Sequence, residues 1–110
     1  MKLTPGERIT LIGLLPDKAN NTVIRLVHEA RMALSFSEEE HKDLKIEEID
    51  LGNGRVFTKW DPGKKDTTKD IELGKVVTDS IVKALRKLNK EESLTGAHIS
   101  VWDKFNVTEE

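Results

Sequence analysis

The sequence predicts a single α+β domain, in which a three-stranded antiparallel meander packs against about four to five helices. Three observations predict this class. The chain has 110 residues, enough for one modest core. Apolar residues recur at helical spacing in both terminal parts. Between them, two strand-like runs flank Asn53-Gly54, a dipeptide that tolerates the two positive φ angles of a tight hairpin turn. The expected order is α-α-α-β-β-β-α-α, with the domain over residues 1–105 and a flexible polar tail over residues 106–110.

The first helix is predicted to begin after Thr4 and to end near Leu15. Thr4 can cap the helix, Pro5 suits the first helical position, and Glu7 completes a capping box. Pro16 disfavours a helical conformation in the residue before it, so the helix should stop there.

Two further helices follow. The first starts at a cap on Asn21 or Thr22 and runs to about Ser35. Its expected core-facing residues are Val23, Leu26, Val27, Ala30 and Leu34. The run Ser37–Glu40 is a second capping box, with acids in the first turn, and opens a short helix that ends near Leu44.

The hairpin spans residues 46–60. With Asn53-Gly54 as the turn, Gly52 pairs with Arg55 and Leu51 pairs with Val56. Period-2 alternation then places one set of residues on a single face, which we expect to be buried: Ile49, Leu51, Val56, Thr58 and Trp60. Ile46 and Phe57 fall on the reverse face, which has no obvious cover within the chain.

A third strand is predicted over residues 69–73, because a lone hairpin would be marginally stable. A long helix follows over residues 74–90, and Ser93 or Thr95 can cap a final helix. The apolar stripe of the long helix comprises Val77, Ile81, Leu85 and Leu88.

The composition excludes several classes of site. There is no cysteine, so disulfides, thiolate metal sites and cysteine nucleophiles are absent. The N-terminal stretch has no apolar signal region, and no run approaches the roughly 20 apolar residues that a membrane span needs. We therefore expect a cytoplasmic protein that does not associate with membranes.

Charge is unevenly distributed along the chain, although the net charge is only −2. Residues 38–50 hold seven acids and two lysines, whereas residues 59–90 hold nine bases and five acids. Such blocks can face each other across the fold, face a partner, or be solvated. A solvated and partly self-compensating surface is the simplest interpretation.

No motif predicts catalysis, a cofactor or a metal. His28-Glu29 begins the pattern of a zinc-protease helix, but Met32 stands where the second histidine is needed. The three histidines are His28, His41 and His98, and no pair has ligand spacing. The glycine-rich Gly52–Gly54 joins two strands, so it lacks the helix N-terminus of a phosphate-binding loop.

A candidate interaction surface combines the reverse face of the hairpin with the basic block. Its residues are Ile46, Phe57, Lys64, Lys65, Lys69, Lys83, Arg86 and Lys87.

Short motifs along the chain resemble a group of small uncharacterised proteins of tailed bacteriophages and prophages of Gram-positive bacteria. The motifs are Lys2-Leu3-Thr4, Glu7-Arg8-Ile9, Leu14-Leu15-Pro16, the run 34–40, Leu94-Thr95, His98-Ile99-Ser100 and Lys104-Phe105. The resemblance implies a phage context and action in the cytoplasm of a bacterial host. It brings no assigned activity, so no functional residue is carried over.

The resulting hypothesis is a non-enzymatic protein-interaction module of phage or prophage origin, which self-associates or binds a host protein. Two alternatives stay open. One is an accessory protein that binds nucleic acid through the basic residues. The other is a binder of a small ligand, such as a nucleotide, in a pocket between sheet and helices.

Overall fold

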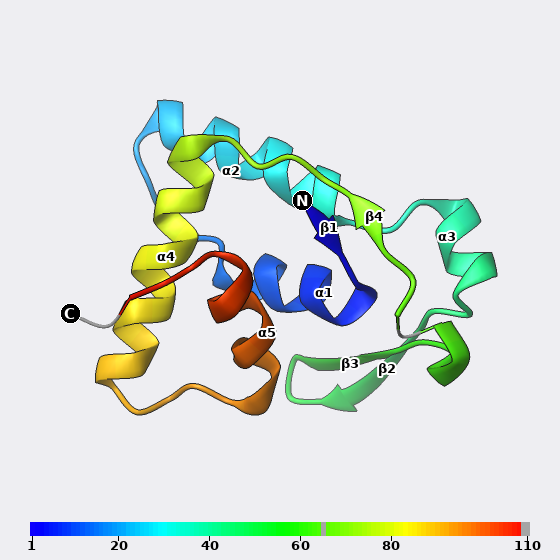
Figure 1. Ribbon diagram of the computed structural model, residues 1–110. Helices are drawn as coiled ribbons and strands as arrows, with labels where there is room; N and C mark the ends of the chain where they lie inside the picture. The colour runs from blue at the N-terminus through cyan, green and yellow to red at the C-terminus, as the bar shows by residue number, and fades with distance from the viewer. Residues whose placement is uncertain (65, 109–110) are drawn as a thin grey trace.

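Figure 1 shows the computed structural model, which describes residues 1–64 and 66–108. The described residues form five α-helices and two small antiparallel sheets of two strands each, which confirms the α+β class. The elements are β1 (Lys2–Leu3), α1 (Pro5–Leu14), α2 (Asn21–Leu34), α3 (Glu38–Asp43), β2 (Glu47–Gly52), β3 (Arg55–Lys59), the 3-10 turn η1 (Pro62–Lys64), β4 (Lys69–Asp70), α4 (Lys75–Lys90) and α5 (Gly96–Lys104).

The helix starts follow the local signals in the sequence. In α1 the Thr4 hydroxyl accepts a hydrogen bond from the Glu7 N–H at 3.2 Å, and the Glu7 carboxylate accepts one from the Thr4 N–H at 2.9 Å. Ser37 and Glu40 make the same reciprocal pair at α3. In α2 the cap is Asn20, one residue before the predicted position. Capping chemistry depends on neighbouring residues alone, so the sequence predicts it well.

The core lies between α1, α2, α4 and α5. Its buried apolar residues are Leu3, Leu11, Leu14, Leu15, Val27, Ala30, Leu34, Ile71, Val77, Ile81, Leu85, Val101 and Val107. The predicted apolar stripes of α2 and α4 supply six of these residues. The other residues of the two stripes pack against the core. Val107 is only 8% exposed, so the core extends past residue 105, and residues 109–110 lie outside the described part.

The three-stranded meander is wrong. β4 pairs with the N-terminal strand β1, in the register Lys2 with Asp70 and Leu3 with Lys69. The hairpin of β2 and β3 stays a separate sheet, below α1 in Figure 1. β1 has two residues, too few for any alternation to be visible in the sequence. Its pairing instead brings Leu3, which is fully buried, into the core.

The hairpin keeps its predicted turn and changes its register. Asn53 and Gly54 have φ angles of 55° and 74°, as a two-residue turn of this kind requires, and Gly52 pairs with Arg55. Beyond Gly52 the strands shift, so that Asp50 pairs with Val56 and Leu51 has no partner residue.

The cause of the shift lies in the two residues that flank Leu51. The Asp50 carboxylate accepts a hydrogen bond from the Gly52 N–H at 2.8 Å, and Gly52 adopts a φ of 81°. This local bond and the left-handed glycine form a bulge, which displaces one strand by a residue.

The predicted buried face of the hairpin is wrong for Ile49, Leu51 and Val56, which are all exposed. The shift moves Ile49 to the face opposite Thr58, whereas Val56 keeps the face of Thr58 and is exposed close to the turn. Trp60, the last residue of that set, is half-buried against α1, where its ring lies close to Gly6. A one-residue slip exchanges the faces of a strand, and the bulge has this effect on the β2 side of the turn.

Candidate functional site

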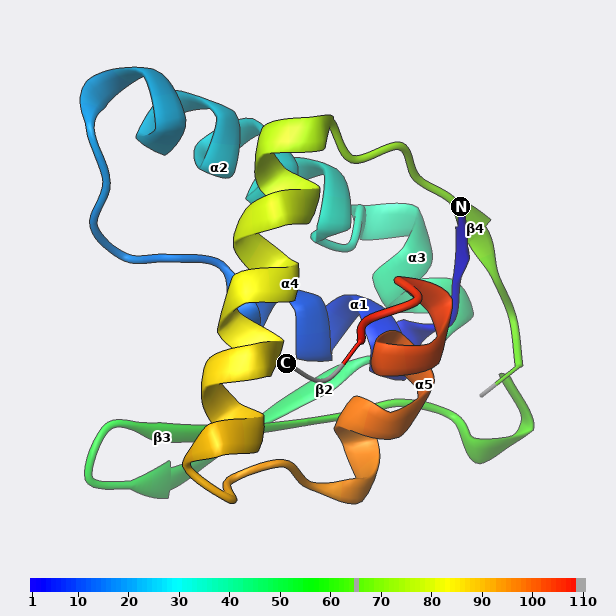
Figure 2. The same cartoon turned by 60° about the vertical axis from the view of Figure 1, so that its left-hand side comes forward.

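The hairpin carries the largest concentration of exposed apolar side chains among the described residues. Leu51 is 60% exposed, Val56 59% and Phe57 52%, and Ile49 is also exposed. Figure 2 shows the hairpin along the lower side of the molecule, with its turn projecting at the left. Apolar side chains gathered on one exposed element mark an interaction surface more often than scattered ones do.

The register defines two faces. Glu47 pairs with Lys59 and Ile49 pairs with Phe57, so these four side chains lie on one face of the two-stranded sheet. All four are exposed, and Lys59 Nζ lies 3.3 Å from a carboxylate oxygen of Glu47. We call this set, Glu47, Ile49, Phe57 and Lys59, the outer face of the hairpin.

The opposite face of the hairpin is turned towards the helices. Thr58 and Ile46 are half-buried, and both line a hollow with Ile9 and Ile12 of α1. The candidate residues Ile46 and Phe57 were predicted on one face, and the structure separates them. Phe57 stays exposed, as expected, while Ile46 is partly covered by α1.

A groove lies between the hairpin and the N-terminal ends of α1 and α5. Its volume is about 590 Å³. The lining residues are mostly apolar or small and include Gly6, Ile9, Val56, Phe57, Trp60 and Ala97. Its polar lining comes from threonines, Ser100 and Glu7.

The acidic and basic blocks partly neutralise each other. Lys69 Nζ lies 3.5 Å from a Glu40 oxygen, and Lys64 Nζ lies 4.0 Å from an Asp43 oxygen. Two of the predicted basic residues are thus paired with α3 and belong to a self-compensating surface. Lys65 lies outside the described residues.

The remaining predicted cations lie together on α4. Lys83, Arg86 and Lys87 line a second groove of about 590 Å³, and Lys90 extends the set. Arg86 also donates hydrogen bonds to the carbonyl and hydroxyl oxygens of Thr108, both at 3.1 Å. Lys90 is absent from the surface predicted from the sequence, although its spacing of seven residues from Lys83 places it on the same helix face.

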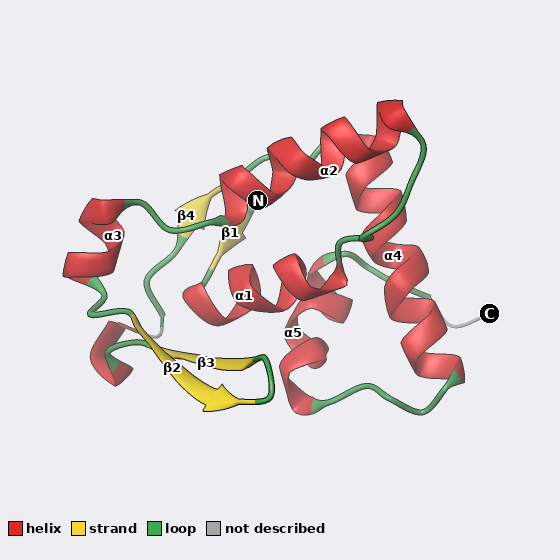
Figure 3. Ribbon diagram, turned by 180° about the vertical axis from the view of Figure 1, so that it is seen from behind, coloured by secondary structure: helices red, strands yellow, loops and turns green. Residues whose placement is uncertain are grey.

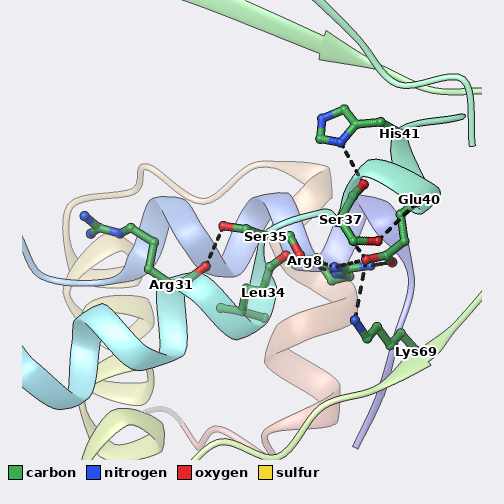
Figure 4. Close-up of polar contacts among 8 residues, drawn as sticks. All are labelled: Arg8, Arg31, Leu34, Ser35, Ser37, Glu40, His41 and Lys69. Atoms are coloured by element: carbon green, nitrogen blue, oxygen red, sulfur yellow. Dashed lines mark hydrogen bonds and ion pairs between the residues drawn. The ribbon is translucent and has the colours of Figure 1, made fainter.

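A buried arginine joins α1 to the junction of α2 and α3 (Figure 4). Arg8 is only 2% exposed. Its guanidinium donates to the carbonyl oxygens of Leu34 at 3.1 Å and Ser35 at 2.6 Å, and to both carboxylate oxygens of Glu40 at 2.5 and 3.3 Å. It also lies 4.0 Å from the centre of the Phe36 ring. The arginine thus binds the carbonyl end of α2 and the acid that caps α3.

The neighbouring Glu7 makes a second junction, with α5. Glu7 is 5% exposed, and its carboxylate accepts hydrogen bonds from Lys104 Nζ at 2.6 Å and from the Ser100 hydroxyl. Lys104 Nζ also donates to the Lys2 carbonyl oxygen at 2.5 Å. Two adjacent residues of opposite charge therefore hold α1 to different parts of the chain.

The pKa shifts agree with a structural role for both carboxylates. The hydrogen bond from Arg8 lowers the pKa of Glu40 to about 2, against the opposing effect of desolvation. Burial raises the pKa of Glu7, but hydrogen bonds from Lys104 and Ser100 outweigh burial and hold it below its usual value. A general acid or base near neutral pH needs a pKa near 7, so neither carboxylate suits that task.

The histidines have ordinary structural settings. His98 Nδ1 accepts a hydrogen bond from the Thr95 N–H at 2.9 Å and so helps to cap α5. His41 Nδ1 lies 2.9 Å from the Ser37 carbonyl oxygen. Among residues 1–64 and 66–108, no three His, Asp or Glu side chains gather in a way that could hold a metal ion.

Several residues of the short motifs singled out in the sequence meet at the two junctions. Lys2, Thr4, Glu7, Ser100 and Lys104 form one of them. Arg8 and the run 34–40 form the other. In this chain these residues carry helix caps and buried charges.

Comparisons with known proteins give no relative. No protein-family model matches the chain, no curated protein matches it, and no solved structure matches it. In the described part of the chain, no helix has the length and apolarity needed to cross a membrane.

Proposed function

We propose that the protein is a non-enzymatic interaction module that self-associates through the outer face of its hairpin. One observation carries this proposal: a two-stranded sheet exposes Ile49 and Phe57 beside an ion pair of opposite charges. A two-stranded hairpin is marginal alone, and packing against another layer stabilises it. The helices cover part of one face, and a partner on the outer face would cover the other.

A second copy of the chain fits this face because the face is self-complementary. Consider a two-fold axis that runs parallel to the strands, just below the outer face. It places β2 of one copy over β3 of the other, at the same height along the strands. Since Glu47 pairs with Lys59 and Ile49 with Phe57, each Glu47 then meets the partner's Lys59, and each Ile49 meets the partner's Phe57. In this interface, apolar side chains contact each other across the two copies, and each charged side chain meets one of opposite charge.

The proposal keeps the biological context that the resemblance implies, which is a phage or prophage protein acting in the bacterial cytoplasm. A host protein that binds the same face would compete with self-association. The small size of the face predicts a weak and reversible dimer.

Sedimentation equilibrium from micromolar to millimolar protein tests the proposal. The wild type should show a concentration-dependent dimer, and Phe57→Ser should weaken dimerisation at least tenfold, or about 1.4 kcal/mol, because it removes apolar contacts made twice in each dimer. Met32→Ser is the matched control, because Met32 is an exposed apolar residue on α2. A wild type that stays monomeric at millimolar concentration contradicts the proposal.

Charge-reversed variants test the two-fold geometry. Glu47→Lys and Lys59→Glu should each dimerise poorly alone, because each places like charges opposite each other in the dimer. Mixing the two should restore a 1:1 dimer, because both contacts then join opposite charges. Equal dimerisation of the separate and mixed variants would show that another surface is used.

A small-ligand function has one observation in its favour, the groove between the hairpin, α1 and α5. Its volume is within the range of ligand pockets, and its lining includes Trp60, Phe57 and Ile9. No lysine or arginine is among the described lining residues, and the carboxylate of Glu7 is already paired with Lys104, so the groove suits a neutral ligand better than a nucleotide phosphate. Thermal-shift screening should then show stabilisation by nucleosides rather than by nucleotides, since a bound ligand raises the melting temperature by mass action.

A further inference from the structure

The exposed face of α4 carries four cations in a row. Lys83, Arg86, Lys87 and Lys90 follow the i, i+3, i+4, i+7 spacing of one helix face. They line one groove, and the acid Asp79, one turn before Lys83, lies at its end, so the lining keeps an excess of three positive charges. The row extends for about 10 Å along the helix at 1.5 Å per residue. The opposite side of α4 supplies Val77, Ile81 and Leu85 to the core, so the helix is fixed with its basic face outward.

The three lysines of this face keep most of their charge available, while Arg86 is held by Thr108. Within the described residues, no acid forms an ion pair with Lys83 or Lys90, and Lys87 lies 4.0 Å from Glu91 in an exposed pair that contributes little. This distinguishes the α4 row from Lys69, which lies 3.5 Å from the half-buried Glu40. The pair of Lys64 with Asp43 is as long and as exposed as that of Lys87 with Glu91, so it contributes as little. Favourable interaction with the helix dipole accounts for cations in the last turn, but Lys83 stands well before it.

We propose that this face of α4 binds the phosphate backbone of a nucleic acid. A straight row of ammonium and guanidinium groups fits a linear polyanion, whereas a folded acidic protein would also need an apolar centre to its contact. The half-buried Val82 is the sole apolar side chain in the lining. No aromatic side chain lines the groove in the described part of the chain, so bases have nothing to stack on. Binding is therefore independent of sequence and similar for single and double strands.

The net charge of −2 does not oppose this binding at moderate salt. The acidic helix α3 lies on the opposite side of the molecule from α4, as Figures 1 and 3 show. The molecule measures 39 × 32 × 30 Å, whereas exposed charges are screened over about 10 Å at 0.1 M salt. A nucleic acid on α4 therefore meets a local positive field. This inference does not depend on the hairpin, so it can be tested separately from the proposed function.

Fluorescence anisotropy with labelled 20-nucleotide single strands and duplexes of two unrelated sequences tests the inference on the full chain. The duplex affinity should fall about 40-fold between 50 and 200 mM salt, as expected for about three neutralised phosphates. The triple variant Lys83→Gln, Lys87→Gln, Lys90→Gln should lose at least tenfold in affinity at 50 mM salt. The corresponding triple Lys→Arg variant should retain binding, which separates lost charge from lost folding.

The control variant removes the same charge elsewhere, with Lys18→Gln, Lys42→Gln and Lys45→Gln, and should bind within about threefold of the wild type. Equal losses in both glutamine variants, or no binding at 50 mM salt, overturn the inference. Binding of poly-glutamate but not of the oligonucleotides also overturns it and identifies an acidic protein as the partner. The Phe57→Ser variant should bind the oligonucleotides like the wild type, so failure here leaves the proposed dimer unaffected.

Discussion

At the scale of single residues, the most unusual feature of this protein is the burial of two charged side chains, Arg8 and Glu7. Charged side chains are almost never fully buried unless they are paired, and both of these are buried and fully engaged. Neither burial is visible in the sequence, because each depends on partners that lie 26 to 97 residues away. The sequence shows Glu7 as a capping residue, and Arg8 carries no local signal.

Removal of the buried guanidinium should destabilise the fold strongly. Arg8→Met leaves the Glu40 carboxylate and the Leu34 and Ser35 carbonyl oxygens without their donor, so we expect a loss of about 3 kcal/mol in unfolding free energy. Arg25→Met is the control, because Arg25 is exposed on α2 and its loss should change stability by less than about 0.5 kcal/mol. Urea denaturation measures both, and similar losses in the two variants would contradict the account.

Glu40 makes stability depend on acid pH. Its folded-state pKa is lowered from the usual 4.5 to about 2, so folding favours the carboxylate. This contribution is fully present above pH 4.5 and is lost as the pH falls towards 2. Glu40→Gln keeps the capping function of the side chain but removes the charge. The wild type should be more stable than this variant at pH 6, and the difference should shrink by pH 3. A difference that is constant with pH would argue against the pairing with Arg8.

At the scale of elements, local chemistry predicted most of the helices and misjudged the strands. The caps of α1 and α3 follow from the residues beside them. The pairing of β1 with β4 joins residues more than 60 positions apart and has no local signature. The bulge at Leu51 depends on whether Asp50 bonds the Gly52 amide, and that bond competes with regular strand pairing. Asn53-Gly54 therefore determines the position of the hairpin turn but not the register of the two strands.

Two glycine substitutions should have opposite effects. Gly13 lies inside α1 and is exposed, and an added Cβ would meet nothing within 4 Å. Gly13→Ala should therefore stabilise the protein by about 0.5 to 1 kcal/mol through the unfolded chain. Gly54→Ala should destabilise it, because its φ of 74° is unfavourable for alanine. Shifts in the urea midpoint with an unchanged slope measure both effects, and a destabilising Gly13→Ala would show that α1 is strained.

At the scale of the whole molecule, the candidate surface separates into two parts. The predicted surface joined Phe57 to the lysines of residues 64–87, but the structure pairs Lys64 and Lys69 with α3 and leaves Lys83, Arg86 and Lys87 on the other side. In Figure 3, α3 lies at the opposite end of the molecule from α4, and the hairpin runs from the side of α3 towards α5. The charged residues of this surface can be identified from the sequence. Which of them form ion pairs with each other depends on the fold.

Stability should also vary across the molecule. The strands of the hairpin are exposed along almost their whole length, whereas α1, α2 and α4 face the common core. Backbone amides of β2 and β3 should exchange hydrogen much faster than those of α4 at low protein concentration. At concentrations where the dimer forms, protection of the hairpin amides should rise. Slow exchange in the hairpin of the monomer would mean that the helices already stabilise it.

The junction between Glu7 and Lys104 also restricts how the chain can fold during synthesis. Its two members lie 97 residues apart, and the β1–β4 pair adds a second long-range closure. On the ribosome, α1 emerges early but must wait for α5 before its buried carboxylate finds an ammonium partner. Until then Glu7 and the apolar side of α1 stay hydrated and open to non-native contacts. Folding should therefore be concerted and late, and nascent chains that end before Lys104 should lack a stable core.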